Sequence, residues 1–218
     1  MGTSNWQNIS YSIEMIREIN PRSVLDVGSG FGRWGFLCRE MLDVWEGRTY
    51  PESWQVRIDA IEAFPPNITP VYDYVYDNVY KGDAAKIIDE LGEYDLIIFG
   101  DVLEHFSKRE GDILLKKAVR RAQKAVLIHI PLGKQWPQSE RDNNTYEEHR
   151  SVWEASNLLT RRARLKVFRD YIGRRFAVAI ILKPGVKLRS RVRRWLGQWR
   201  RARKADLKDI RYAFRGAK

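Results

Sequence analysis

The amino-acid sequence predicts an α/β fold built around a doubly wound sheet. Short apolar segments typical of buried strands alternate along the chain with segments of helical periodicity. Residues 93–99, EYDLIIF, have the length and apolar character of a parallel strand that is covered on both faces. Residues 24–32, VLDVGSGFG, are typical of a strand that turns sharply into a helix at a ligand site. The chain of 218 residues is long enough for one such domain with a full core.

The same patterns place the other elements. Helices are expected at 9–19, 33–44 and 110–123, with a further helix opening in 144–153. Strands are expected at 23–27, 56–61, 93–99, 124–130, 164–170 and 175–182. Residues 65–80 contain four tyrosines and have strong strand propensity, and we expect simple packing to explain most of these rings.

The charge of the chain is concentrated at one end. Residues 185–218 contain 13 Lys or Arg and two acids, so this segment accounts for the whole net charge of +11. Pro184-Gly185 ends the last expected strand. The sequence therefore predicts a domain over 1–184 and a basic tail over 185–218.

The tail has the pattern of an amphipathic helix. At 100° per residue, apolar side chains such as Trp195 and Trp199 fall on one side, and arginines occupy much of the other. Basic helices with Trp on the apolar face bind anionic membrane surfaces. Binding to nucleic acid, and packing against the domain or a second subunit, remain alternatives for this segment.

Other features of the sequence indicate a cytoplasmic location. No stretch of about 18 apolar residues is present, and the N-terminus lacks the apolar core of a secretory signal. The single cysteine, Cys38, cannot form an internal disulfide and suits a reducing compartment. With its basic tail, the protein is expected to be cytoplasmic and peripheral on the inner face of the membrane.

Three glycines follow the first strand at alternate positions. Gly28, Gly30 and Gly32 come after Asp26 in the spacing Asp-x-Gly-x-Gly-x-Gly. Glycine permits positive φ and a close approach of the backbone to a ligand. The loop resembles motif I of the class I S-adenosylmethionine (SAM) methyltransferases. The resemblance implies SAM as cofactor and a mostly parallel seven-stranded sheet whose last strand is antiparallel. It also implies that Asp26 orders the loop and reaches the amino group of SAM.

Acidic residues follow the next two strands. Glu62 ends the second expected strand, where one carboxylate can bind both hydroxyls of a ribose. The resemblance implies a short third strand that ends at Asp83. Asp83 is similar in position to the acid that accepts a hydrogen bond from the adenine amino group in this family, and Ala84 would lie against the ring. These three residues are therefore predicted cofactor ligands.

Two further strings resemble small-molecule methyltransferases. Residues 100–105, GDVLEH, follow the fourth strand, and Gly100 and Asp101 are predicted to contact SAM. Residues 147–153, EEHRSVW, resemble a string that borders the acceptor pocket. We predict His149 as the catalytic base, whereas His105 is more often structural or close to SAM in similar enzymes. His129 lies inside the fifth strand and is expected to be packed and hydrogen-bonded.

Three acidic residues near the expected site raise the possibility of a metal ion. Asp101, Glu104 and Asp142 could together offer the oxygen ligands that Mg²⁺ prefers. Acids in a D-V-L-E-H string usually have other roles, so no metal is predicted.

The function that the sequence predicts is SAM-dependent methyl transfer. The expected acceptor is a hydroxyl of a sugar, a lipid-linked glycan or another small molecule at the cytoplasmic face of the membrane. Alternatives are a quinone methyltransferase, an RNA methyltransferase that grips nucleic acid with its tail, and a catalytically silent SAM-binding subunit. The chain lacks the Asn/Asp-Pro-Pro-aromatic string with which base-amino methyltransferases hold an extruded base.

Overall fold

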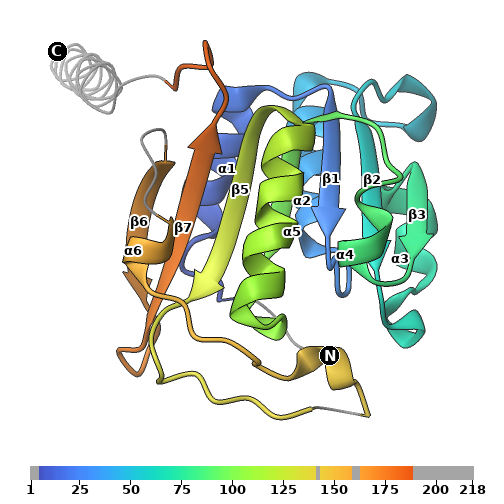
Figure 1. The fold of residues 1–218 in the computed structure, drawn as a ribbon. Coiled ribbons are helices and arrows are strands. Elements are labelled where there is room, and N and C mark those ends of the chain that lie inside the picture. The colour runs from blue at the N-terminus through green and yellow to red at the C-terminus, as the bar shows by residue number, and fades with distance from the viewer. Residues whose placement is uncertain (1–4, 141–142, 159–162, 189–218) are drawn as a thin grey trace, which may run out of the picture. The chain divides into compact units, whose positions relative to one another are not determined.

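The protein contains one twisted sheet in the order β3-β2-β1-β4-β5-β7-β6 (Figure 1). The computed structural model describes residues 5–140, 143–158 and 163–188. The strands are β1 (Ser23–Val27), β2 (Arg57–Glu62), β3 (Asn78–Lys81), β4 (Tyr94–Gly100), β5 (Ala122–Pro131), β6 (Ala163–Arg169) and β7 (Arg175–Leu182). Strands β1 to β5 pair in parallel, whereas β7 runs antiparallel to both of its neighbours.

Helices cover both faces of the sheet. They are α1 (Ile9–Ile19), α2 (Arg33–Leu42), α3 (Pro70–Val75), α4 (Ala84–Ile87), α5 (Lys108–Arg121) and α6 (Ala155–Leu158). In Figure 1, α1 and α2 lie behind the sheet and α5 lies in front of it. Helix α5 begins at a capping box in which Ser107 and Glu110 satisfy each other's backbone N–H groups. The predicted doubly wound architecture is confirmed.

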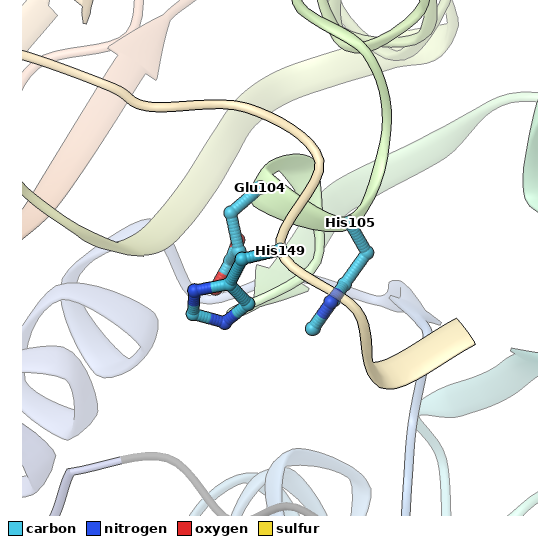
Figure 2. A group of neighbouring side chains, drawn as sticks. All are labelled: Glu104, His105 and His149. Carbon is cyan, nitrogen blue, oxygen red and sulfur yellow. The ribbon is translucent and has the colours of Figure 1, made fainter. Parts of the chain in front are cut away.

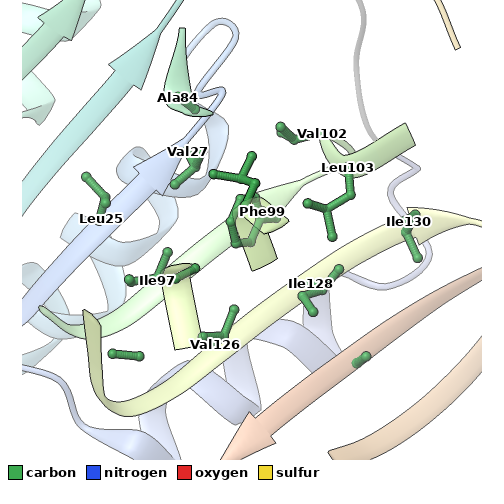
Figure 3. Packing of buried hydrophobic residues seen from close by; sticks show 14 of the residues in the cluster. Leu25, Val27, Ala84, Ile97, Phe99, Val102, Leu103, Val126, Ile128 and Ile130 are labelled. Carbon is green, nitrogen blue, oxygen red and sulfur yellow. The ribbon is translucent and has the colours of Figure 1, made fainter. Parts of the chain in front are cut away.

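The main core lies between α5 and the sheet, and Figure 3 shows the residues that the strands contribute to it. Alternate residues of β1, β4 and β5 face it: Leu25, Val27, Ile97, Phe99, Val126 and Ile128. Leu114 and Ala118 of α5 are fully buried against this cluster. Burial of each large apolar side chain contributes about 1.5–3 kcal/mol, so this face holds the strand order in place.

The opposite face of the sheet carries a buried histidine. His129 of β5 is fully buried and stacks on Trp34 of α2, with 4.0 Å between ring centroids. Its Nε2 lies 2.8 Å from the hydroxyl of Ser12 in α1. Burial lowers the pKa of His129 to about 3. The side chain is packed and hydrogen-bonded, as the sequence predicted, and it is a neutral structural link between two helices and the sheet.

Two expected elements differ from the structure. Within 65–80, where strand propensity is strong, residues Pro70–Val75 form the helix α3. Pro70 is at the first helical position, where the N–H that proline lacks would have no partner within the helix. The helix expected in 144–153 is absent. Only Thr145–Glu147 form a 3-10 turn, since the N–H groups of His149, Arg150 and Ser151 donate to carbonyls of other segments.

The chain divides into two units, Met1–Val186 and Lys187–Lys218. The sequence placed this boundary after residue 184. The predicted amphipathic helix lies outside the described residues from 189 onward. None of the described helices combines the length and the apolar character that crossing a membrane requires.

The histidine link generates a prediction for stability. Between pH 6.5 and pH 3 the unfolded chain binds a proton at position 129 that the folded chain excludes, since the folded-state pKa lies below the ordinary value. This contribution to stability therefore falls on acidification, by up to about 1.4 kcal/mol per pH unit. Urea unfolding at pH 7 and pH 5 should show a steeper loss in the wild type than in His129→Gln. Equal losses in the two proteins would contradict this account.

Candidate functional site

A cavity of about 580 Å³ opens at the carboxyl ends of the parallel strands. The strand order reverses between β1 and β4, and ligands of open α/β sheets bind in the crevice at such a point. Nine of the eleven predicted site residues line the cavity: Gly28, Gly30, Glu62, Asp83, Ala84, Gly100, Asp101, His105 and His149. Asp26 and Gly32 are not among the lining residues. The volume is within the range of small-molecule and cofactor sites, about 300–1,000 Å³.

Asp26 lies behind the glycine loop. Its side chain is 1% exposed, and Oδ2 accepts hydrogen bonds from the N–H of Gly35 at 3.0 Å and from the hydroxyl of Tyr76 at 2.7 Å. Burial raises the pKa of Asp26 to about 7, and these two donors oppose the shift. The carboxylate thus joins the end of β1 to the first turn of α2 and to the chain after α3. Its contact with the amino group of SAM stays a prediction.

The glycines in the loop have the backbone geometry that their sequence pattern predicts. Gly28, Gly30 and Gly32 have φ values of 63°, 59° and 93°, which residues other than glycine rarely adopt. A Cβ on Gly28 would lie 2.6 Å from Cγ2 of Val102. A Cβ on Gly30 would meet no atom within 4 Å, because this residue faces the open cavity. The loop therefore offers bare backbone to a ligand.

Glu62 supports the same loop from the end of β2. Its carboxylate accepts from the N–H groups of Gly30 and Phe64, each at 2.8 Å, and from Nδ2 of Asn67 at 3.2 Å. Burial raises the pKa of Glu62, although these donors work against the shift. The side chain is fixed in one orientation on the cavity wall.

Two tyrosines of the site were missed by the sequence analysis. The hydroxyl of Tyr72 donates to the carbonyl of Gly30 and lies 2.9 Å from Oγ of Ser29, and Tyr76 binds Asp26. Both rings are buried. The usable signal was Thr69-Pro70, a helix start that brings residues 72 and 76 to one face of the chain. These tyrosines hold the loop and do more than fill space.

The third and fourth strands supply the next part of the wall. Asp83 caps α4, since its Oδ1 accepts from the N–H of Ala85 at 2.8 Å, and Ala84 follows it. Gly100 must be glycine because a Cβ would lie 2.5 Å from the ring of Trp34. Asp101 has a φ of 58°, an uncommon conformation that aspartate tolerates better than most residues.

Both predicted histidines reach the cavity from different segments. His105 belongs to the 3-10 turn Leu103–His105 after β4, whereas His149 comes from the irregular segment after residue 143 (Figure 2). The ring centroids are 5.1 Å apart. Nδ1 of His149 lies 2.6 Å from the carbonyl of Trp136, and Nδ1 of His105 lies 3.1 Å from the carbonyl of Glu148. A carbonyl only accepts, so each Nδ1 is the donor, and in the neutral form of each ring the lone pair is on Nε2.

Glu104 completes this group. Its side chain is 1% exposed and lines the cavity beside the two histidines (Figure 2). Burial, and then the charge of Asp101, raise the pKa of Glu104 well above its usual range. Burial, and then the neighbouring His105, lower the pKa of His149. Asp142, considered with Asp101 and Glu104 as an oxygen ligand, lies outside the described residues.

Comparisons with solved structures define the fold. The chain is similar to a SAM-dependent methyltransferase from Archaeoglobus fulgidus, with a TM-score of 0.58 and 15% identity over 80% of this chain and 92% of that one. An O-methyltransferase from Bacillus cereus in complex with SAH gives 0.55 at 11% identity, over 84% of each chain. The DhpI-SAH complex gives 0.50 at 14% identity, over 84% of this chain and 87% of that one. No family model matches the sequence, and neither does any curated protein.

These likenesses establish the fold. The chain has the fold of the class I SAM-dependent methyltransferases, with the seven-stranded, mostly parallel sheet that the glycine loop indicated.

The hydroxyl of Tyr76 provides a test of the loop. Tyr76→Phe removes one of the two donors to the buried Asp26 carboxylate and should lower the free energy of unfolding by about 1–3 kcal/mol. It should also weaken SAM binding, because the loop loses its fixed geometry. Tyr74→Phe, at a tyrosine that is 53% exposed, is the matched control and should leave both quantities unchanged. Unfolding curves and titration calorimetry measure them; equal behaviour of the two variants would refute the role of Tyr76.

Proposed function

We propose that the protein is a SAM-dependent methyltransferase that modifies a hydroxyl group of a sugar, a lipid-linked glycan or another small molecule. One observation carries the proposal. The glycine loop with Glu62 and the imidazole of His149, whose Nε2 lone pair is available, line the same cavity. The proposed cofactor site and an imidazole able to accept a proton from an acceptor hydroxyl thus lie in the same cavity.

The residues present fit SAM. Gly28 and Gly30 offer backbone that can approach a ligand closely, and Gly30 has no neighbour where a side chain would project. Glu62 presents a carboxylate suited to two adjacent ribose hydroxyls. Asp83 and Ala84 lie on the same wall, where an adenine amino group and ring would be accommodated.

The chemistry follows from these positions. When bound, SAM would supply a methyl group attached to a sulfonium sulfur. Transfer of this methyl group forms an O–CH3 bond to the acceptor and breaks the S–CH3 bond, whose electron pair stays on the sulfur. In the simplest form of the reaction, Nε2 of His149 accepts the hydroxyl proton while its Nδ1–H remains bound to the carbonyl of Trp136. That hydrogen bond fixes the tautomer and the ring orientation. The protein contributes alignment of donor and acceptor and removal of the proton.

The acceptor fraction tests this proposal. Purified protein is incubated with methyl-labelled SAM and a cell lysate separated into lipid, glycan, RNA and protein fractions. Label should enter the lipid or glycan fraction, and His149→Ala should reduce it at least tenfold while SAM binding is retained. Label in RNA would contradict the acceptor class, and absence of label from all fractions would indicate a SAM-binding subunit without turnover.

A membrane location for the reaction is supported by the sequence pattern of 185–218 alone. Each cationic residue near an anionic leaflet contributes about 1 kcal/mol to binding, and two tryptophans fall on the apolar side of the predicted helix. Salt weakens membrane and nucleic-acid binding alike, so the apolar side provides the discriminating test.

Trp195→Ala combined with Trp199→Ala should release the protein from anionic liposomes and leave SAM affinity intact. Sedimentation with liposomes measures the first quantity and calorimetry the second. Arg-to-Lys changes at Arg200 and Arg201 keep the charge and should preserve sedimentation. If the double tryptophan variant sediments like the wild type, the tail does not bind membranes through its apolar side.

A further inference from the structure

We propose that Glu104, His105 and His149 form a binding site for a divalent transition-metal cation at the acceptor end of the cavity. Each residue offers one ligand atom, and the three atoms lie within 4.8 Å of one another. The side chains come from two segments more than 40 residues apart and gather at one place (Figure 2). Ligands of one such cation lie about 2.0–2.2 Å from it, so the observed grouping is close to what shared coordination requires.

The carboxylate of Glu104 independently indicates a missing ligand. Its side chain is 1% exposed, and neither oxygen has a hydrogen-bond partner among the described residues. Buried polar groups almost always have partners, and an unpaired buried carboxylate is costly. Since Glu104 lines the cavity, a cation there would supply the missing partner.

The two imidazoles are oriented as metal ligands usually are. Metal-bound histidines donate their other ring N–H to a carbonyl or carboxylate, which fixes the ring and its tautomer. Here Nδ1 of His149 and of His105 each pair with a backbone carbonyl, at 2.6 and 3.1 Å. The backbone holds the two segments together as well, because the N–H groups of Arg150 and Ser151 donate to the carbonyl of Glu104 at 2.8 and 3.0 Å.

The ligand set selects the kind of cation. Two imidazoles and one carboxylate suit Mn²⁺, Fe²⁺, Co²⁺, Ni²⁺ or Zn²⁺, whereas Mg²⁺ and Ca²⁺ prefer oxygen ligands throughout. Three protein ligands leave coordination positions open, as in catalytic sites. Asp101 lies on the same wall and its charge favours a cation nearby.

This inference rests on the proposed function and deepens it. A bound cation polarises an acceptor hydroxyl in an open position and lowers its pKa. The O–H bond then breaks with its proton passing to water in the cavity, and the oxygen remains on the cation with its electron pair. With a cation bound, His149 is a metal ligand and no longer the base. The cation then activates the acceptor hydroxyl in place of His149.

Cation binding is measured on the whole chain of 218 residues, prepared without a histidine tag, stripped with a chelator and dialysed. Titration with Mn²⁺ followed by electron paramagnetic resonance, and with Co²⁺ followed by visible absorption, should show one equivalent bound. Glu104→Gln and His105→Gln should each weaken binding at least tenfold. Glu52→Gln makes the same change at an exposed carboxylate that does not line the cavity and should bind like the wild type. Thermal melts without metal report whether each variant is folded.

Absence of stoichiometric binding, or wild-type binding by folded Glu104→Gln and His105→Gln, would overturn the cation site. The methyltransferase proposal is tested separately with labelled SAM. Turnover that is insensitive to chelator, in a chain that binds no cation, contradicts the cation site and leaves the methyltransferase intact. Stoichiometric cation binding in a chain that fails to bind SAM supports the cation site and contradicts the methyltransferase.

Discussion

The buried carboxylate of Asp26 is the constraint on which the site depends. It accepts hydrogen bonds from Gly35 at the start of α2 and from Tyr76 after α3, so two segments are fastened to the end of β1. The glycine loop between Asp26 and Gly35 has few side chains of its own to hold its shape. Glu62 from β2 and Tyr72 from α3 bind the loop at Gly30, and the N–H groups of Gly28 and Ser29 donate to the carbonyl of Ile61 at the end of β2.

The two walls of the cavity are made by different physical means. One wall consists of turns at the ends of parallel strands, whose positions follow from the buried sheet. The other includes the irregular segment that carries His149, which is held by backbone hydrogen bonds to Glu104 and Gln138. The first wall carries the residues predicted to bind the cofactor, such as Glu62 and Asp83, whereas the second carries His149. The proposed cation site lies where the two walls meet, because Glu104 and His105 belong to the turn after β4 and His149 to the irregular segment.

Apolar runs and the glycine spacing were sufficient to predict most of the strands, the doubly wound sheet and the positive φ values of the glycine loop, because buried parallel strands and positive φ impose strong residue preferences. The segment 144–153 was predicted wrongly as a helix, since tertiary hydrogen bonds replace the helical ones there. Tyr72 and Tyr76 were assigned to packing because a short helix inside a strand-like composition is easily overlooked. The meeting of Glu104 with His149 depends on that same irregular segment and has no local signal.

Binding of SAH to the wild-type chain and to Glu62→Ala, measured by titration calorimetry, tests the central claim most directly. The account predicts saturable binding at one site in the wild type, competed by SAM, and a loss of at least tenfold in affinity for the variant. Glu62 both supports Gly30 and faces the predicted ribose position. If the wild type shows no saturable binding, or if the folded variant binds equally well, the cavity is not the SAM site described here.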